Sequence, residues 1–103
     1  MDSRKTNNLY ERFSHLYRER AAPLESSRMP WGFQCENGWY NIIYEMSKKI
    51  EKLSTGSPHD CAITEVSRNE DGTLYVEARN LTPPIQDIIT TAREQSRLTC
   101  EFC

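Results

Sequence analysis

The sequence has no apolar run long enough to cross a membrane, since a spanning helix needs about 20 predominantly apolar residues. Its first residues also lack the apolar segment of a secretory signal peptide. We therefore expect a cytoplasmic protein that is not associated with a membrane. In that compartment the four cysteines should be reduced thiols or metal ligands, with disulfides as the less favoured alternative.

Sequence motifs of catalytic sites are also lacking. The chain has no G-x-S-x-G turn, no phosphate-binding glycine loop and no H-E-x-x-H pair. Its two histidines, His15 and His59, lie in none of the patterns in which a base activates a serine or cysteine nucleophile. We therefore expect a protein that is not an enzyme.

The chain has no large excess of charge of either sign. Its net charge of -2 and its pI of about 5.7 exclude the strongly basic composition that is typical of nucleic-acid-binding domains. Residues 1–28 carry six basic against four acidic residues, whereas residues 61–103 carry four against seven. Direct binding of nucleic acid is therefore less favoured than binding of a protein.

What the chain does contain is enough apolar sequence for one small core. It has 103 residues, of which 37% are hydrophobic, and this length corresponds to a single domain. In residues 38–54, apolar residues recur three and four positions apart, while charged residues take the other side. This spacing predicts an amphipathic helix with an apolar stripe of Trp39, Ile42, Ile43, Met46, Ile50 and Leu53, of which Trp39, Ile42, Met46 and Ile50 are expected in the core.

A second amphipathic pattern predicts a helix from Asn8 to about Ala22. Asn7 or Asn8 is the expected N-cap, after a polar arm of residues 1–8, and Pro23 is the expected end. We expect residues 1–28 to be an appendage and residues 29–103 to form the domain. The apolar side of this helix consists of Leu9, Phe13, Leu16 and Tyr17.

Two runs rich in Ile, Thr, Val and Tyr, residues 61–68 and 73–79, predict a β-hairpin. Gly72 in the loop between them can take the positive φ that such a turn requires. Ile63 and Val66 are out of phase with strict alternation, which a β-bulge explains.

A last helix is predicted from its cap, Thr82, to about Arg97. The expected order is thus α-α-β-β-α. It predicts an α+β fold in which a small antiparallel hairpin packs against three helices. Beside the stripe of the central helix, we expect the core to include Leu74, Val76, Ile85, Ile88 and Ile89.

The last four residues of the sequence contain a C-x-x-C pair, Cys100 and Cys103. Two cysteines at this spacing supply half of a tetrahedral zinc site. The other ligands would come from Cys35, Cys61 or His59, or from a matching pair in a second chain across a twofold axis. Alternatively, cysteines of this kind serve as small buried hydrophobic residues. Zinc is the one cofactor that the sequence suggests.

Tyr40 and Tyr44 lie one helical turn apart in the central helix, and Lys48 follows one turn later. Exposed tyrosines and cations are typical of surfaces that bind proteins, although aromatic rings also stack on nucleic-acid bases. We predict that these three exposed side chains bind a partner, together with Arg12 and Arg18 of the first helix.

Three segments carry a resemblance to a known group of sequences. They are the C-x-x-G-W-Y-x-I-I segment that starts at Cys35, the G-T-L-Y-V segment at residues 72–76, and the A-x-x-x-S-x-x-T-C-E-x-C segment at residues 92–103. Through them, residues 31–103 resemble a family of small uncharacterised proteins from bacteriophages, prophages and bacteria. The chain departs from that family in the approach to the hairpin, and many relatives continue past the C-x-x-C pair with further cysteines.

The resemblance implies a small phage-type accessory protein that acts in the cytoplasm of a bacterial host. Such proteins commonly bind a host protein or ribonucleoprotein complex, for instance as inhibitors of an anti-phage defence system, as anti-CRISPR proteins do. We therefore predict a non-catalytic binding protein, and a homodimer is a further expectation for so small a core. The alternative is a small zinc-stabilised nucleic-acid-binding module that needs Cys100 and Cys103 for its fold.

Overall fold

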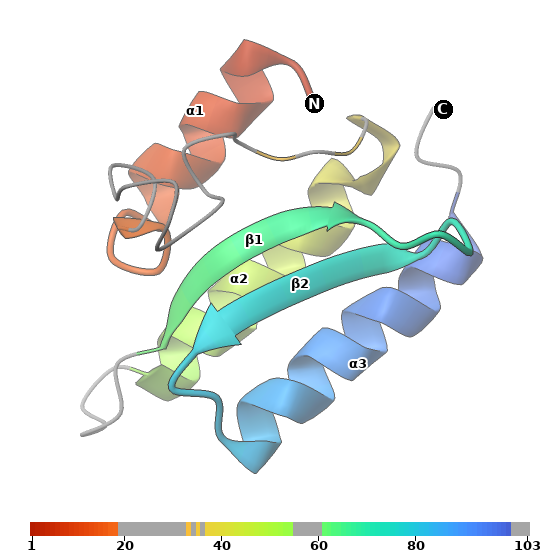
Figure 1. The fold of residues 1–103 in the computed structure, drawn as a ribbon. Helices are drawn as coiled ribbons and strands as arrows, with labels where there is room; N and C mark the ends of the chain where they lie inside the picture. The colour runs from red at the N-terminus through yellow and green to blue at the C-terminus, as the bar shows by residue number, and fades with distance from the viewer. Residues whose placement is uncertain (19–32, 34, 36, 55–60, 100–103) are drawn as a thin grey trace.

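The computed structural model of the chain describes residues 1–18, 33, 35, 37–54 and 61–99 (Figure 1). These residues form three α-helices and a two-stranded antiparallel sheet, which confirms the predicted α+β fold and its α-α-β-β-α order. No helix among the described residues is both long and apolar enough to span a membrane. The elements are α1 (Ser3–Arg12), the 3-10 helix η3 (Asn37–Trp39), α2 (Tyr40–Ser54), β1 (Ala62–Arg68), β2 (Leu74–Arg79) and α3 (Pro83–Arg97).

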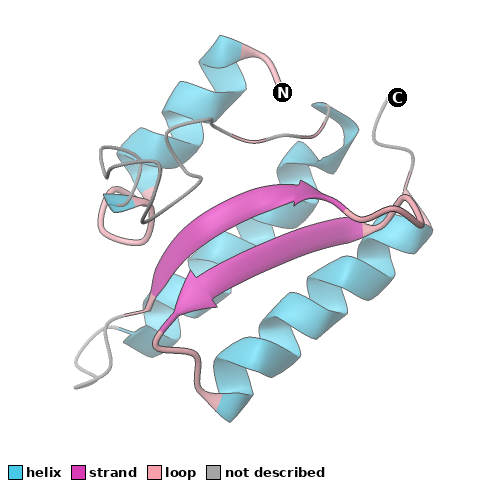
Figure 2. Cartoon of the chain, viewed as in Figure 1, coloured by secondary structure: helices cyan, strands magenta, loops and turns pink. Residues whose placement is uncertain are grey.

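The hairpin of β1 and β2 lies against α2 and α3, while α1 lies on the β1 side of the hairpin (Figures 1 and 2). Its register pairs Val66 with Val76, and the expected bulge is present as an irregularity between Ile63 and Glu65. Because of the bulge, Ile63 lies opposite Ala78 and shares the inner face with the two valines. The bulge thus brings both Ile63 and Val66 to the core.

The loop of the hairpin follows the chemistry of its residues. Gly72 takes a φ of 87°, a left-handed conformation that costs glycine little. The Asp71 carboxylate accepts hydrogen bonds from the backbone N–H of Thr73 at 3.0 Å and from its hydroxyl at 2.6 Å. These two bonds lower the pKa of Asp71. The predicted loop, with its glycine, is confirmed.

Helix α1 differs from the prediction at both ends. It begins at Ser3 and ends at Arg12, whereas the sequence pattern predicted a start at Asn8 and an end near Ala22. The cap is Asp2, whose carboxylate accepts the Lys5 N–H at 2.8 Å. Ala22 and Pro23 lie outside the described residues. The polar start of the chain is therefore a capped helix and not a frayed arm.

Asp2 is itself held by a residue far along the chain. Its backbone N–H donates to the side-chain oxygen of Asn37 at 2.8 Å, and the Asn37 amide donates back to the Asp2 carboxylate at 3.1 Å. The Lys5 N–H, and then Asn37, lower the pKa of Asp2. This reciprocal pair joins the start of α1 to the start of η3.

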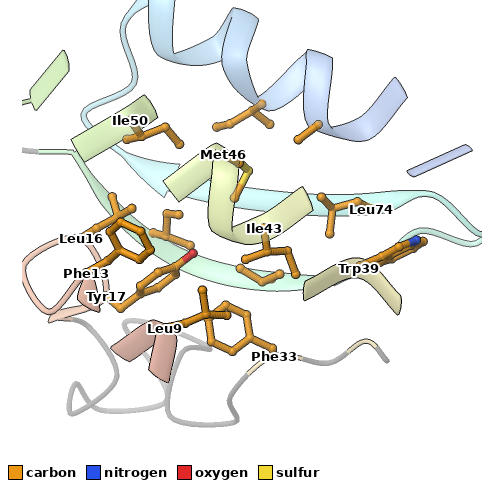
Figure 3. Packing of buried hydrophobic residues seen from close by; sticks show 14 of the residues in the cluster. Leu9, Phe13, Leu16, Tyr17, Phe33, Trp39, Ile43, Met46, Ile50 and Leu74 are labelled. Atoms are coloured by element: carbon orange, nitrogen blue, oxygen red, sulfur yellow. The ribbon is translucent and has the colours of Figure 1, made fainter. Parts of the chain in front are cut away.

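One continuous core contains side chains from every helix and strand (Figure 3). Residues near α1 belong to it as fully as those of α2, and Leu9 and Tyr17 are completely buried. The Tyr17 hydroxyl lies 2.5 Å from the Ser47 hydroxyl, which also donates to the Ile43 carbonyl at 2.7 Å. The described residues before position 19 therefore contribute side chains to the core. The predicted boundary at residue 28 lies outside the described residues and stays a prediction.

The apolar stripe of α2 and the inner residues of β2 and α3 have the predicted positions, with one exception. Trp39, Ile43, Met46, Ile50, Leu74, Ile85 and Ile89 are buried, whereas Ile42, Val76 and Ile88 are partly buried. The exception is Leu53, which belongs to the apolar stripe by its spacing but is 48% exposed. It lies in the last turn of α2, three residues after the buried Ile50.

The far end of α3 is fastened to both neighbouring elements. The Trp39 indole N–H donates to the Thr99 carbonyl at 2.9 Å, just beyond the end of α3. The Ser96 hydroxyl accepts the backbone N–H of Leu74 at 2.9 Å. α3 follows Thr82 as predicted, although the Thr82 side chain makes no capping hydrogen bond.

Candidate protein-binding surface

Tyr40 is the first residue of α2 and lies against α1. The Lys5 ammonium is 5.6 Å from the centre of the Tyr40 ring, within the range of a cation–π contact. The side-chain amide of Asn8 donates to the Tyr40 hydroxyl. Lys5 and Asn8 are three positions apart in α1, so they lie on the same side of that helix. Two residues of α1 thus fix both the ring and the hydroxyl of one tyrosine.

Tyr44 continues the aromatic contacts toward the core. Its ring centre is 6.1 Å from that of Tyr40 and 5.2 Å from that of Phe13, which it meets edge to face. Tyr40 and Tyr44 are both partly buried. The prediction that they form an exposed stripe was therefore wrong in this respect, because α1 packs over them. Lys48, one turn further along α2, is exposed as predicted.

An open cleft of about 570 Å³ borders Tyr40. Its chemistry is polar, with two cations, one carboxylate, two side-chain amides and one aromatic ring. Donors that can bind a carboxylate therefore surround a rigid ring, an arrangement suited to an acidic side chain. The cleft is lined by Arg4, Lys5, Asn7, Asn8, Glu11 and Tyr40. We call these residues the α1–α2 surface.

The two arginines that the sequence analysis selected have different surroundings. Arg12 is exposed in the last turn of α1. The Arg18 guanidinium donates to the His15 carbonyl at 2.8 Å and to the Cys61 carbonyl at 3.3 Å. Arg18 thereby fastens the turn after α1 to the start of β1. The binding roles of both arginines stay predictions.

Sequence reasoning missed Arg4, Lys5 and Asn8 as parts of this surface. A helix that starts at Ser3 places Lys5 and Asn8 on one side, but the predicted start at Asn8 left Arg4 and Lys5 outside the helix. The signal that could have revealed them is Asp2, a favoured capping residue three positions before Lys5.

The predicted zinc ligands fall into two groups. Cys35 and Cys61 are buried and form no disulfide within the described part of the chain, whereas Cys100, Cys103 and His59 lie outside it. Burial raises the pKa of Cys61, and the Arg18 charge opposes this shift only in part. Within the described part of the chain, no three His, Cys, Asp or Glu side chains are grouped as metal ligands. Cys35 and Cys61 therefore resemble small core residues here, and zinc binding stays a prediction.

Comparisons with protein-family models, with curated proteins and with solved structures found no match for this chain.

Proposed function

We propose that this chain is a non-catalytic binding protein whose α1–α2 surface docks on an acidic region of another protein. The observation that carries the proposal is the position of Tyr40, which borders an open cleft with Lys5 over its ring and Arg4 beside it. Arg12, Tyr44 and Lys48 extend this surface along the two helices. Arg18 belongs to it only as a support of the turn after α1.

The geometry favours binding for an energetic reason. The Asn8 and Lys5 contacts already restrict Tyr40, so a partner would immobilise few additional rotatable bonds. Tyrosine and arginine are enriched among residues that dominate binding energy, and a cation next to a ring can still donate to a partner's carboxylate. A half-buried tyrosine with cations around it thus supports recognition of a carboxylate-rich protein surface.

The identity of the partner follows from a different argument. The resemblance to bacteriophage and prophage proteins supports a bacterial host protein or ribonucleoprotein complex in the host cytoplasm. Within that setting, we propose that binding blocks the target, as an inhibitor of an anti-phage defence system such as an anti-CRISPR protein would. The chemistry of the α1–α2 surface supports an acidic partner, while the identity of that partner rests on the resemblance alone.

The experiment is a pull-down from bacterial lysate with tagged protein, nuclease and reducing buffer, read by mass spectrometry. A stoichiometric protein partner is expected to survive nuclease treatment and moderate salt. Recovery that disappears with nuclease would replace this proposal with the nucleic-acid-binding alternative. Zinc content would then be the next quantity to measure, because that alternative needs Cys100 and Cys103.

Two substitutions then test the surface with the captured partner. Tyr40→Ala and Lys5→Glu should each weaken binding by about tenfold or more, the effect expected of a dominant contact. Lys52→Glu is the matched control, because Lys52 is exposed near the other end of α2 and lies outside the cleft. Unchanged affinity in both surface variants, with melting curves like that of the wild type, would exclude this surface.

A further inference from the structure

The cleft of the α1–α2 surface carries charges of opposite sign along α1. Arg4 and Glu11 both line the cleft, and both are exposed. They are seven positions apart, which corresponds to two turns, so they lie on the same side of the helix with about 10 Å between them along its axis. Asn7 and Asn8 line the cleft between them. The cleft therefore changes from basic to acidic over two turns of one helix.

Neither of these two charges is neutralised within the described part of the chain. Arg4 and Glu11 form no ion pair there, in contrast to two arginines of α3, which lie near carboxylates. Arg12 follows Glu11 in sequence, but it lies about 100° around the helix and does not line the cleft. Both charges are thus open to a ligand.

The basic end of the cleft has several donors for one carboxylate. Arg4 supplies a guanidinium, and Lys5 supplies an ammonium that already lies over the ring of Tyr40. The Tyr40 hydroxyl accepts a hydrogen bond from Asn8, so its own O–H can donate to a ligand. At the other end, the carboxylate of Glu11 only accepts hydrogen bonds and attracts a cation. The two ends therefore select different groups.

We propose that the α1–α2 surface recognises a helix of its partner that carries an acidic residue and, seven positions away, a basic one. The acidic side chain would bind the donors of Arg4 and Tyr40, and the basic side chain would pair with Glu11. This inference rests on the proposed function, because it names the chemistry of the partner at the same surface. Glu11 is then the residue that determines which acidic partners are accepted.

The spacing of the two charges favours a helix as the ligand. Residues i and i+7 of a helix are about 10 Å apart along its axis and lie on one side, as Arg4 and Glu11 do. In an extended strand, residues on one face are separated by about 7 Å or about 13 Å, because successive side chains alternate. Neither of these spacings matches. A helix that packs alongside α1 meets both charges at once.

A uniformly anionic ligand is disfavoured by the same arrangement. A nucleic-acid strand carries a phosphate at every nucleotide, so a strand that lies along α1 would place a phosphate near Glu11. Like charges that are close together repel each other. A segment with acidic residues alone would meet the same repulsion. The acidic region of the partner therefore needs a cation within it.

NMR titration of the isotope-labelled protein with synthetic helical peptides tests the proposal. Each peptide has about 16 residues, enough for a helix in an alanine- and glutamine-rich host, with one Glu and, seven positions away, Lys, Gln or Glu. The Glu/Lys and Glu/Gln peptides are also made with the two positions exchanged, because a helix can lie along α1 in either direction. The amide signals of Lys5, Asn8 and Tyr40 report binding in the cleft.

The wild-type chain should bind the Glu/Lys peptide most tightly. In low-salt buffer we expect about two- to fivefold tighter binding than that of the Glu/Gln peptide, the effect of one exposed ion pair. The Glu/Glu peptide should bind no more tightly than the Glu/Gln peptide. Added salt should reduce these differences, since it screens exposed charges.

The charge-reversing substitution Glu11→Lys should invert this order, so that the Glu/Glu peptide binds most tightly and the Glu/Lys peptide most weakly. A gain of binding by the acidic peptide cannot result from unfolding. Glu70→Lys is the matched control, because it makes the same change at an exposed residue of the hairpin loop outside the cleft. That variant should keep the wild-type order.

The possible results separate this inference from the proposed function. Equal affinity of the wild type for all the peptides, or an order that Glu11→Lys leaves unchanged, overturns the inference but keeps the α1–α2 surface as a site for acidic ligands. Absence of any shift at the cleft up to about 5 mM peptide, in wild type and in Glu11→Lys, overturns both, because Arg4 and Lys5 would then bind no carboxylate.

Discussion

The two sides of the core are built from different side chains. Between α1, α2 and β1 the contacts are mainly aromatic, with five ring pairs at centroid distances of 5.1–6.1 Å among Tyr10, Phe13, Tyr17, Phe33, Tyr40 and Tyr44. On the α3 side they are mainly aliphatic, from Met46, Leu74, Ile85, Ile89 and Ala92. We call these the aromatic layer and the aliphatic layer.

The difference shows which features of the sequence specify each layer. Aliphatic side chains follow the helical and strand periodicities, because their only requirement is removal from water. Several rings of the aromatic layer also carry hydroxyl groups, which need partners when buried. The Tyr17 hydroxyl is hydrogen-bonded to Ser47, 30 positions away in sequence, and the Tyr40 hydroxyl accepts a hydrogen bond from Asn8, 32 positions away. The aromatic layer therefore depends on long-range contacts to a greater extent.

The largest expected effect is that of deleting residues 1–18, which removes one side of the aromatic layer. Four buried side chains would be lost, each worth about 1.5–3 kcal/mol, against a total stability of about 5–15 kcal/mol. We expect the remaining chain to lose cooperative unfolding, as measured by circular dichroism and NMR amide dispersion. A truncated chain with well-dispersed amide signals would instead support residues 1–28 as an appendage.

Trp39→Ala should be the most costly single substitution, because this side chain is 1% exposed and joins η3 to the end of α3. We expect a loss of about 3–5 kcal/mol in the free energy of unfolding, measured by urea denaturation. Trp39→Phe keeps a six-membered aromatic ring in the core but lacks the N–H that donates to Thr99. It should therefore cost clearly less than Trp39→Ala. Equal effects of the two variants would contradict this account of the site.

Tyr17 should make the aromatic layer less stable at high pH. Burial raises the pKa of its hydroxyl above the ordinary value of 10.0. The unfolded chain therefore releases this proton first, so the contribution of Tyr17 is fully present below pH 10 and is lost as the pH rises above it. The loss is at most about 1.4 kcal/mol per pH unit.

Urea denaturation of wild type and Tyr17→Phe between pH 8 and about 11.5 measures this contribution. The difference between the two curves isolates Tyr17 from the other groups that titrate in this range. At pH 8 the variant should be less stable by about 1 kcal/mol, since it lacks the bond to Ser47. Parallel curves at all pH values would show that the hydroxyl is accessible to water.

The smallest expected effect is the coupling between Phe13 and Tyr44. Their edge-to-face pair should contribute about 0.5–1.5 kcal/mol beyond the burial of its surface. A double-mutant cycle with Phe13→Leu and Tyr44→Leu measures this coupling, and Ile43→Val in place of Tyr44→Leu provides the comparison with an aliphatic residue of the same core. A coupling near zero would mean that the rings act only as apolar volume.

Local patterns sufficed for the hairpin, α2 and α3. The i, i+3, i+4 spacing of α2 predicted the burial of Trp39, Met46 and Ile50, and the sequence position of Gly72 predicted its positive φ. The bulge was also foreseeable, because Ile63 and Val66 can both reach the core only if the alternation is interrupted. In each case the residues that determine the structure lie close together in the sequence.

The start of α1 and the half-burial of Tyr40 and Tyr44 could not be foreseen in this way. Asn7 and Asn8 are favoured capping residues, yet Asp2 caps α1 with the support of Asn37, which lies 35 positions away. Tyr40 and Tyr44 occupy the flank of α2, and that flank is covered only because α1 packs there. Such contacts depend on the tertiary arrangement, which periodicity does not encode.

The Trp39 indole also gives the chain a fluorophore at a useful place. It is one of two tryptophans, and its N–H is bonded to the Thr99 carbonyl at the far end of α3. Loosening of that end would expose the ring and shift its emission to longer wavelength. Fluorescence of a variant that lacks Trp31 would therefore follow the docking of α3 without an added dye.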